Sequence, residues 1–183
     1  CAFSKGRLSA ALRDKPYKLD LEDIEERTRQ AWRRGASEVC LQGGIAPGYS
    51  GHTYLEILGA VRAGAPDIHI HAFSPLEVMH GAETLGETPA HYLARLSEAG
   101  LNSLPGTAAE ILDDQVRALI CPDKIDTATW LEVMRAAHRV GLRSTATIMF
   151  GHVDHPEHWA RHLLAIRSLQ DETGGFTEFV PLP

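Results

Sequence analysis

Two histidines alternate with isoleucines in the run "DIHIHAF", residues 67–73. Successive side chains of an extended strand point to opposite faces, so His69 and His71 would share one face and the isoleucines the other. Such a pair at a strand end could hold zinc in a metal-dependent hydrolase. It could also bind a polar ligand, or each imidazole could be hydrogen-bonded within the core. The local pattern leaves these three interpretations open.

A glycine pair in "LQGGIAP", residues 41–47, marks a second candidate site. The segment Gln42-Gly43-Gly44 follows an apolar run, and two glycines let a ligand approach the backbone closely. A tight turn would use the same residues. Polar residues or glycines also lie in or just after other apolar runs, and these are further candidates: Ser74, Ser103, Gly106, Thr147, His152, Asp154 and Glu178.

Two glutamates have a competing local explanation. Ser74 with Glu77, and Thr107 with Glu110, have the spacing of a capping box, in which the glutamate accepts a hydrogen bond from the first free amide of a helix. Capping is therefore the first expectation for both glutamates, and ligand binding is the alternative. Ser74 also precedes a predicted helix whose free amides could hold an anion.

The stretch "GHVDHPEHWARHLL", residues 151–164, is rich in histidine. His158 and His162 are four residues apart and would lie on one helix face, where they could chelate a metal. A solvated helix surface is the more ordinary explanation, and it is the expectation here. His152 and Asp154 directly follow an apolar run, so we expect them to contact a ligand.

These candidates lie in a repeating unit in which a charged amphipathic helix ends on a glycine and a short apolar strand follows. Left-handed helix caps favour glycine because it has no Cβ. Helix starts are predicted at Asp20, Ser74, Thr107 and Asp126. The expected cap glycines are Gly35, Gly64, Gly100, Gly141 and Gly175.

Strands that alternate with helices at this spacing predict an α/β fold with a parallel sheet. No G-x-G-x-x-G run follows a strand, which disfavours a dinucleotide-binding sheet. Polar residues at several strand ends are typical of a (β/α) TIM-type barrel, where the loops share one active site. We therefore expect residues 1–183 to form a single domain, a partial barrel that lacks the first strand and the C-terminal part.

The composition favours a small-molecule ligand. The chain is 44% hydrophobic and carries a formal net charge of −6, which argues against nucleic acid or an anionic membrane as a partner. No apolar run is long enough to span a membrane, so a cytoplasmic location is expected. The three cysteines are far apart and do not suggest a disulfide framework.

The first residues, "CAFSKGR", resemble the end of the radical S-adenosylmethionine signature C-x-x-x-C-x-x-C. The resemblance implies that Cys1 is the third cysteine ligand of a [4Fe–4S] cluster, whose open iron binds S-adenosylmethionine. It also implies two further cysteines, three and seven positions before residue 1. The 183-residue chain by itself is then expected to assemble no cluster and to be inactive.

The whole chain resembles the FO synthase family, in its CofH-type half. The resemblance rests on "EVCLQGGIAP", "IHIHAFSPLEV", "EAGLNSLPGTAAEILDD", "AAHRVGLRSTATIMFGHVDHPEHWARHL" and "RSLQDETGGFTEFVPLP". Futalosine-pathway enzymes of menaquinone synthesis are similar in "SLPGTAAEIL" and "LQDETGGFT", and they are the alternative. The chain departs from the superfamily pattern at Ile45, because a glutamate that binds the amino group of S-adenosylmethionine commonly follows Gly-Gly.

The resemblance implies a transferase of deazaflavin synthesis. Its substrates would be L-tyrosine and 5-amino-6-(D-ribitylamino)uracil, with an electron donor and a companion FO synthase half as partners. The tyrosine Cα–Cβ bond would break, and the 4-hydroxybenzyl unit would bond to C5 of the uracil. Placement at strand ends predicts His69, His71, His152 and Glu178 as catalytic residues in contact with substrate, and Ser74, Thr147 and Asp154 as further substrate contacts. For S-adenosylmethionine, the resemblance implies contacts at Gly43 and Gly44, and placement at strand ends adds Gln42, Ser103, Gly106 and Glu110.

Overall fold

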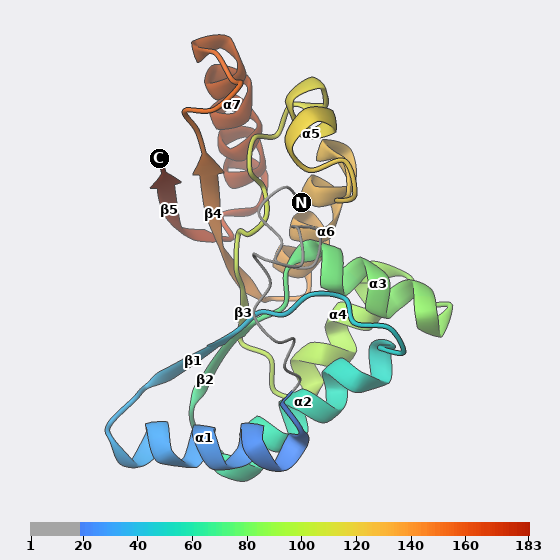
Figure 1. Ribbon diagram of the computed structural model, residues 1–183, viewed down its shortest axis with the longest axis vertical. Helices are drawn as coiled ribbons and strands as arrows, with labels where there is room; N and C mark the ends of the chain where they lie inside the picture. The colour runs from blue at the N-terminus through green and yellow to red at the C-terminus, as the bar shows by residue number, and fades with distance from the viewer. Residues whose placement is uncertain (1–18) are drawn as a thin grey trace, which may run out of the picture.

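The computed structural model describes residues 19–183 (Figure 1). These residues form seven helices and five strands, with one helix or two consecutive helices between successive strands. The strands are β1 (Glu38–Leu41), β2 (His69–Ala72), β3 (Ser103–Leu104), β4 (Arg143–Met149) and β5 (Phe176–Leu182). The helices are α1 (Leu21–Arg33), α2 (Gly51–Gly64), α3 (Pro75–Leu85), α4 (Pro89–Glu98), α5 (Asp114–Ile120), α6 (Thr127–Arg139) and α7 (Pro156–Thr173).

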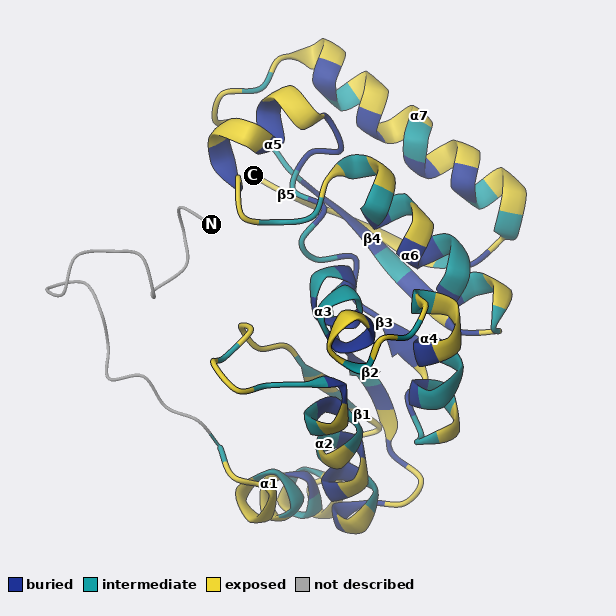
Figure 2. Cartoon of the chain, turned by 90° about the vertical axis from the view of Figure 1, so that its right-hand side faces the viewer, coloured by how far each residue is buried: buried dark blue, intermediate teal, exposed yellow. Residues whose placement is uncertain are grey.

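The described strands form one parallel sheet in the order β1-β2-β3-β4-β5, which is also their order along the chain. Each strand therefore pairs with the next, with His69 beside Glu38 and His71 beside Cys40 and Ser103. Figure 2 looks onto the helices, with the strands behind them. This one-sided cover over an all-parallel sheet is the arrangement of a partial (β/α) barrel, as predicted.

Alternating side chains fix the two faces of the sheet. Ile70 and Ala72 are fully buried beneath the helices, in a cluster with Leu58 of α2 and Leu93 of α4. A second cluster joins α6 and α7 around Trp130. The polar side chains of β2 consequently point to the opposite face, which would be the lumen of a barrel.

Most predicted helix starts are confirmed. Asp20, Ser74 and Asp126 each accept a hydrogen bond from the backbone amide three residues further on. The prediction at Thr107 is wrong, because residues 107–112 form turns and α5 begins at Asp114, capped by Asp113. Hydrogen bonds from the Gly106 backbone to Thr145 and Thr147 of β4 hold the chain along the sheet here.

The cap glycines are confirmed at three positions, since Gly35, Gly100 and Gly141 have φ values of 87°, 108° and 88°. The other two predictions are wrong. Gly174, one residue earlier than expected, takes the left-handed conformation after α7, and Gly64 has no left-handed backbone. A Cβ on Gly64 would lie 2.4 Å from the carbonyl oxygen of Glu25, so this glycine permits close packing of α2 on α1.

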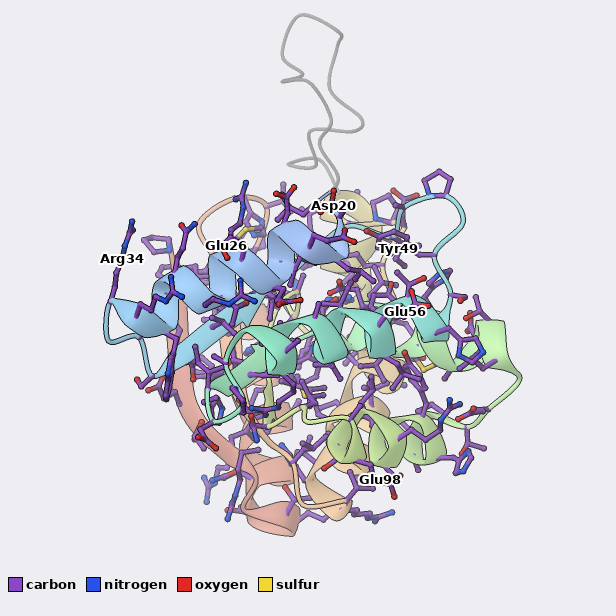
Figure 3. All side chains as sticks on the ribbon, turned by 90° about the horizontal axis from the view of Figure 1, so that it is seen from below. Asp20, Glu26, Arg34, Tyr49, Glu56 and Glu98 are labelled. Carbon is purple, nitrogen blue, oxygen red and sulfur yellow. The ribbon has the colours of Figure 1, made fainter. Side chains whose placement is uncertain are left out.

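The same contact explains how α1 and α2 lie side by side in Figure 3, where Asp20 and Arg34 mark the two ends of α1. At the end of α2, the guanidinium of Arg62 donates to the carbonyl oxygens of Ile68 and Gly100 and to Asn102 Oδ1. Asn102 Oδ1 also accepts a hydrogen bond from the Ile70 amide. One arginine thus ties together the entries to β2 and β3.

The expectation that His158 and His162 form a solvated surface is wrong. Both are buried, because α7 turns this side of the helix toward β4 and the segment before α5. His162 Nδ1 accepts a hydrogen bond from the Leu112 amide, and His158 Nδ1 accepts one from the His155 amide. Within residues 19–183, no helix is long and apolar enough to cross a membrane.

Candidate functional site

The two histidines of β2 meet at one serine of β3. His69 Nε2 lies 2.8 Å from Ser103 Oγ, and His71 Nδ1 lies 2.7 Å from the same oxygen. Glu38 of β1 completes the row, with its carboxylate 3.6 Å from His69 Nε2. The hydroxyl can donate to one imidazole and accept from the other, so the three side chains form a continuous hydrogen-bonded line across the sheet.

Partial burial favours the neutral form of His71. Desolvation lowers the pKa of His71, and the nearby Glu38 carboxylate partly opposes this shift. Glu178 of β5 adds a weaker opposing contribution to the pKa of His71 from an exposed position. A neutral imidazole facing the open side of the sheet can accept a proton or a hydrogen bond from a ligand. The zinc alternative gains no support, since residues 19–183 contain no group of three metal-ligating side chains.

The glycine pair after β1 is joined to α3 by a carboxylate. The Gly43 amide donates to Glu77 Oε1 at 3.2 Å, although the two residues are 34 positions apart in the chain. Glu77 Oε2 accepts from both the Ser74 amide and the Ser74 hydroxyl at 2.8 Å. The predicted capping box is therefore confirmed, but it uses one carboxylate oxygen and leaves the other for the segment after β1.

Glu77 is 3% exposed, which is unusual for a carboxylate. Desolvation raises its pKa, while the hydrogen bonds from Ser74 and Gly43 act in the opposite direction. In the described part of the chain, no lysine, arginine or histidine forms an ion pair with it. The sequence predicted Glu77 chiefly as a helix cap, and its contact with Gly43 joins two segments that lie beyond the paired residues of β1 and β2.

A pocket of about 460 Å³ opens beside this carboxylate. Its walls come from the segments that follow β1, β2 and β3, together with the start of α6, which is the edge where a barrel places its active site. Gln42 reaches across this edge and accepts a hydrogen bond from the Thr107 hydroxyl at 2.8 Å. The lining residues are Gln42, Gly43, Gly44, Ile45, Ser74, Leu76, Glu77, Thr107, Ala108, Asp123, Lys124, Ile125 and Trp130.

Backbone strain concentrates at this edge. Phe73, directly after β2, has φ = 64°, and Glu110, in the segment after β3, has φ = 46°. A left-handed backbone at a bulky side chain costs on the order of 1–3 kcal/mol and persists only where the surroundings impose it. The predicted capping box at Glu110 is absent, and its carboxylate instead pairs with Lys124 at 2.6 Å.

Two other predicted site residues are engaged with each other. The Gly106 amide donates to Thr145 Oγ1, and the Thr147 hydroxyl donates to the Gly106 carbonyl. A Cβ on Gly106 would lie 2.6 Å from the Cα of Ala146, so this glycine lets the β3 segment lie against β4. The assignment of Gly106 to cofactor and of Thr147 to substrate stays a prediction.

The loop after β4 is organised around Asp154. Its carboxylate accepts from the amides of Gly151 and His152 and from the indole of Trp159. Although desolvation opposes ionisation, these hydrogen bonds hold its pKa well below the usual range. His152 contacts the Met149 carbonyl and the Val153 amide. Both predicted ligand contacts thus have a role within the loop, and their contact with a ligand stays a prediction.

The fold and the residues at the strand ends together indicate a class of barrel enzyme. It is a partial parallel βα barrel whose strand ends carry a glycine pair, a buried carboxylate and a line of polar side chains. The model of the radical SAM superfamily matches residues 1–166 of the sequence, including Cys1, which lies outside the described residues. The chain belongs to the radical SAM superfamily.

Several curated proteins are similar over the whole chain. An FO synthase from Streptomyces avermitilis is 50% identical over 183 residues, which are 100% of this chain and 21% of that protein. A 5-amino-6-(D-ribitylamino)uracil–L-tyrosine 4-hydroxyphenyl transferase from Methanothermobacter thermautotrophicus is 49% identical over 183 residues, 100% of this chain and 50% of that protein. The chain thus spans half or less of the length of these two relatives.

A solved structure supports the fold. The crystal structure of methylornithine synthase (PylB) matches with a TM-score of 0.65 at 19% identity, over 84% of this chain and 42% of that one. At this identity the match bears on the fold alone. The predicted partial barrel of the radical SAM class is thereby confirmed.

Proposed function

We propose that the chain belongs to an enzyme that couples the 4-hydroxybenzyl group of L-tyrosine to 5-amino-6-(D-ribitylamino)uracil. The observation that carries the proposal is the 49% identity to the Methanothermobacter transferase over 100% of this chain. Similar identity to fused FO synthases is consistent with the same step and with a companion FO synthase half. The enzyme would act in the cytoplasm with an external electron donor.

The proposed cofactors are a [4Fe–4S] cluster and S-adenosylmethionine, which together supply a radical able to take a hydrogen atom from tyrosine. Cys1 is the proposed cluster ligand in this chain. The described residues fit S-adenosylmethionine, because the glycine pair gives access to the backbone and the pocket contains a buried carboxylate without an ion-pair partner. Gln42, Gly43 and Gly44 would bind it, with Ser103, Gly106 and Glu110 as the further proposed contacts.

The open face of the sheet would bind the substrates. His69, His71 and Ser103 form a fixed polar line, and the neutral His71 can accept a proton that a substrate releases. Glu178 would approach the same space from β5. Ser74, Thr147, His152 and Asp154 are the remaining proposed substrate-side residues. The barrel wall would exclude water and stray hydrogen donors from the reacting radical.

The test uses the full-length protein with its cluster reconstituted under anaerobic conditions. The protein is incubated with S-adenosylmethionine, dithionite, tyrosine and the ribityl-uracil, and the products are followed by mass spectrometry. We expect 5′-deoxyadenosine and the coupled product to form together, only when both substrates are present. Formation of 5′-deoxyadenosine without coupling would contradict the substrate assignment, and futalosine derivatives would be tried next.

A further inference from the structure

We propose that Glu77 binds the α-amino group of S-adenosylmethionine. The inference rests on the proposed function, because it concerns the cofactor of the same reaction. It assigns the amino-binding carboxylate to the first turn of α3, after β2. The residue after the glycine pair is Ile45, which has no charge to offer.

The hydrogen bonds of Glu77 leave acceptor capacity on the side of the glycine pair. Oε2 is occupied by the amide and hydroxyl of Ser74. Oε1 accepts one hydrogen bond among the described residues, from the Gly43 amide at 3.2 Å. A carboxylate oxygen can accept about two hydrogen bonds, so Oε1 can take one more donor at the end of β1.

Hydrogen bonds from Ser74 and Gly43 stabilise the Glu77 carboxylate but do not neutralise its charge. A buried carboxylate loses its hydration, and the cost is met by pairing or by several hydrogen bonds. Glu110, on the same pocket edge, has such a partner in Lys124. Glu77 is more deeply buried and has no cationic partner within residues 19–183. A cation that enters the pocket with the ligand would supply it.

The functional groups of S-adenosylmethionine indicate which of its two cationic groups would pair with Glu77. S-adenosylmethionine has a sulfonium, which carries charge but no N–H group, and an ammonium, which has three donors. A carboxylate with one open acceptor site is matched by the ammonium through a charge-assisted hydrogen bond. Space is available, because an added Cβ on Gly44 would meet no atom within 4 Å and one on Gly43 would lie 3.8 Å from Glu77 Oε1.

The experiment compares two ligands on two matched variants of the full-length, cluster-containing protein. The ligands are S-adenosylmethionine and an analogue in which hydrogen replaces the α-amino group. The variants are Glu77→Gln and Glu56→Gln, which removes a carboxylate from the exposed side of α2 (Figure 3). Affinities are measured by equilibrium dialysis, and the spectrum of the reduced cluster is recorded with and without each ligand by electron paramagnetic resonance.

We expect Glu77→Gln to weaken binding of S-adenosylmethionine by about 10- to 100-fold, the range of a lost hydrogen bond to a charged group. The same substitution should change the affinity of the deaminated analogue by less than about 3-fold, because that ligand never made the contact. Glu56→Gln should leave both affinities unchanged. The wild-type protein should bind the deaminated analogue about 10- to 100-fold more weakly than S-adenosylmethionine.

Equal weakening of both ligands by Glu77→Gln would overturn the inference, since it would mean that Glu77 only positions Gly43. If that variant does not fold, the wild type decides, because equal affinity for the two ligands would also overturn it. Failure of the proposed function is distinct. If the substrate assignment fails, 5′-deoxyadenosine forms without the coupled product and the two ligand affinities still test Glu77. If the cofactor assignment fails, wild-type protein with an intact cluster binds neither ligand, and its spectrum does not change when S-adenosylmethionine is added.

Discussion

Gly43 and Gly44 have space around them that the described residues do not fill. Neither glycine has the left-handed φ that would exclude alanine, and an added Cβ would meet ordinary contact distance at Gly43 and nothing at Gly44. The glycines are thus dispensable for the local backbone. The lack of side chains at Gly43 and Gly44 instead leaves room for a ligand at the end of β1.

Gly44→Ala should therefore leave folding intact and weaken the binding of S-adenosylmethionine. We expect a change below about 0.5 kcal/mol in the free energy of unfolding and a loss of about 10-fold or more in affinity, because the methyl group would occupy ligand space. Denaturant unfolding and equilibrium dialysis test the two parts. Unchanged affinity would mean that the ligand does not approach this backbone.

Ser103 offers a second residue-scale test, because one hydroxyl holds both imidazoles. Ser103→Ala removes the hydrogen bonds to His69 and His71 and frees the two rings to rotate. We expect product formation to fall by about 10- to 100-fold. Because Ser103 is also a proposed contact to S-adenosylmethionine, the cluster spectrum recorded with that ligand shows whether cofactor binding is lost as well. Ser97→Ala, at the end of α4, is the control and should keep full activity.

The strand faces were predictable at the residue scale, and the long-range contacts were not. Alternation in "DIHIHAF" correctly placed His69 and His71 opposite the buried isoleucine of β2. The contact between Glu77 and Gly43 depends on the relative placement of two segments, which periodicity does not encode. The burial of His158 and His162 was missed for the same reason, since an i, i+4 spacing names a helix face but not its neighbour.

At the scale of elements, the turn between α2 and β2 is held by Arg62. Its guanidinium donates to the carbonyls of Ile68 and Gly100 and to Asn102. These contacts lie at the strand starts, away from the pocket, and that end of a barrel contributes to stability. Substitution of Arg62 should therefore lower the stability of the fold without changing ligand binding in the pocket.

Arg62→Met should lower the free energy of unfolding by about 2–4 kcal/mol, because it leaves several carbonyl groups without their charged donor. Affinity for S-adenosylmethionine at 25 °C should stay within about 3-fold of wild type. Arg167→Met is the control. Arg167 is exposed and, among residues 19–183, its ion pair is the 3.7 Å contact with Asp171, so its loss should cost less than about 0.5 kcal/mol. Equal effects of the two substitutions would contradict the role of Arg62.

Glycines show why element boundaries were predicted unevenly. A left-handed cap is a local event, and three of the predicted caps are found. Gly64 and Gly175 have tertiary causes instead, since a Cβ would collide with Glu25 at the first and with the His138 ring at the second. Sequence spacing cannot distinguish a glycine that ends a helix from one that admits a neighbour.

At the scale of the whole molecule, the buried His162 and the partly buried His138 link stability to pH. Desolvation lowers the pKa of both His138 and His162 from 6.5 to about 4, with Arg143 and Arg117 contributing in the same direction. The unfolded chain protonates these side chains more readily than the folded one. Stability is therefore full above about pH 6.5 and falls as the pH drops toward 4.

The free energy of unfolding should fall between pH 7 and pH 4.5, with up to about 3 kcal/mol from each histidine. Denaturant titrations across this range measure the slope. His162→Asn places an oxygen near the position of Nδ1, so it should reduce the slope by about half. His91→Asn, on an exposed part of α4, should not change the slope. An unaltered slope in His162→Asn would show that this imidazole is not the titrating group.

The parallel βα architecture was predictable from the regular alternation of helices and strands, and the order β1-β2-β3-β4-β5 agrees with it. The segment 105–113 departs from the regular unit. Its capping spacing predicted a helix, but the backbone of Gly106 is bonded to Thr145 and Thr147 of β4, which holds the chain along the sheet. Contacts with a strand that comes later in the sequence overrode the local signal.

The agreement between strand order and chain order has a consequence for biosynthesis. Each new strand docks beside the one made just before it, so no pairing must wait for a distant segment. A nascent chain that leaves the ribosome at about 5–20 residues per second could add one unit every few seconds. Until the next unit arrives, the last strand made presents an unpaired edge to the surrounding water. The sheet can thus grow in one direction during translation, and its growing edge moves along the chain while β1 stays at the other edge of the described sheet.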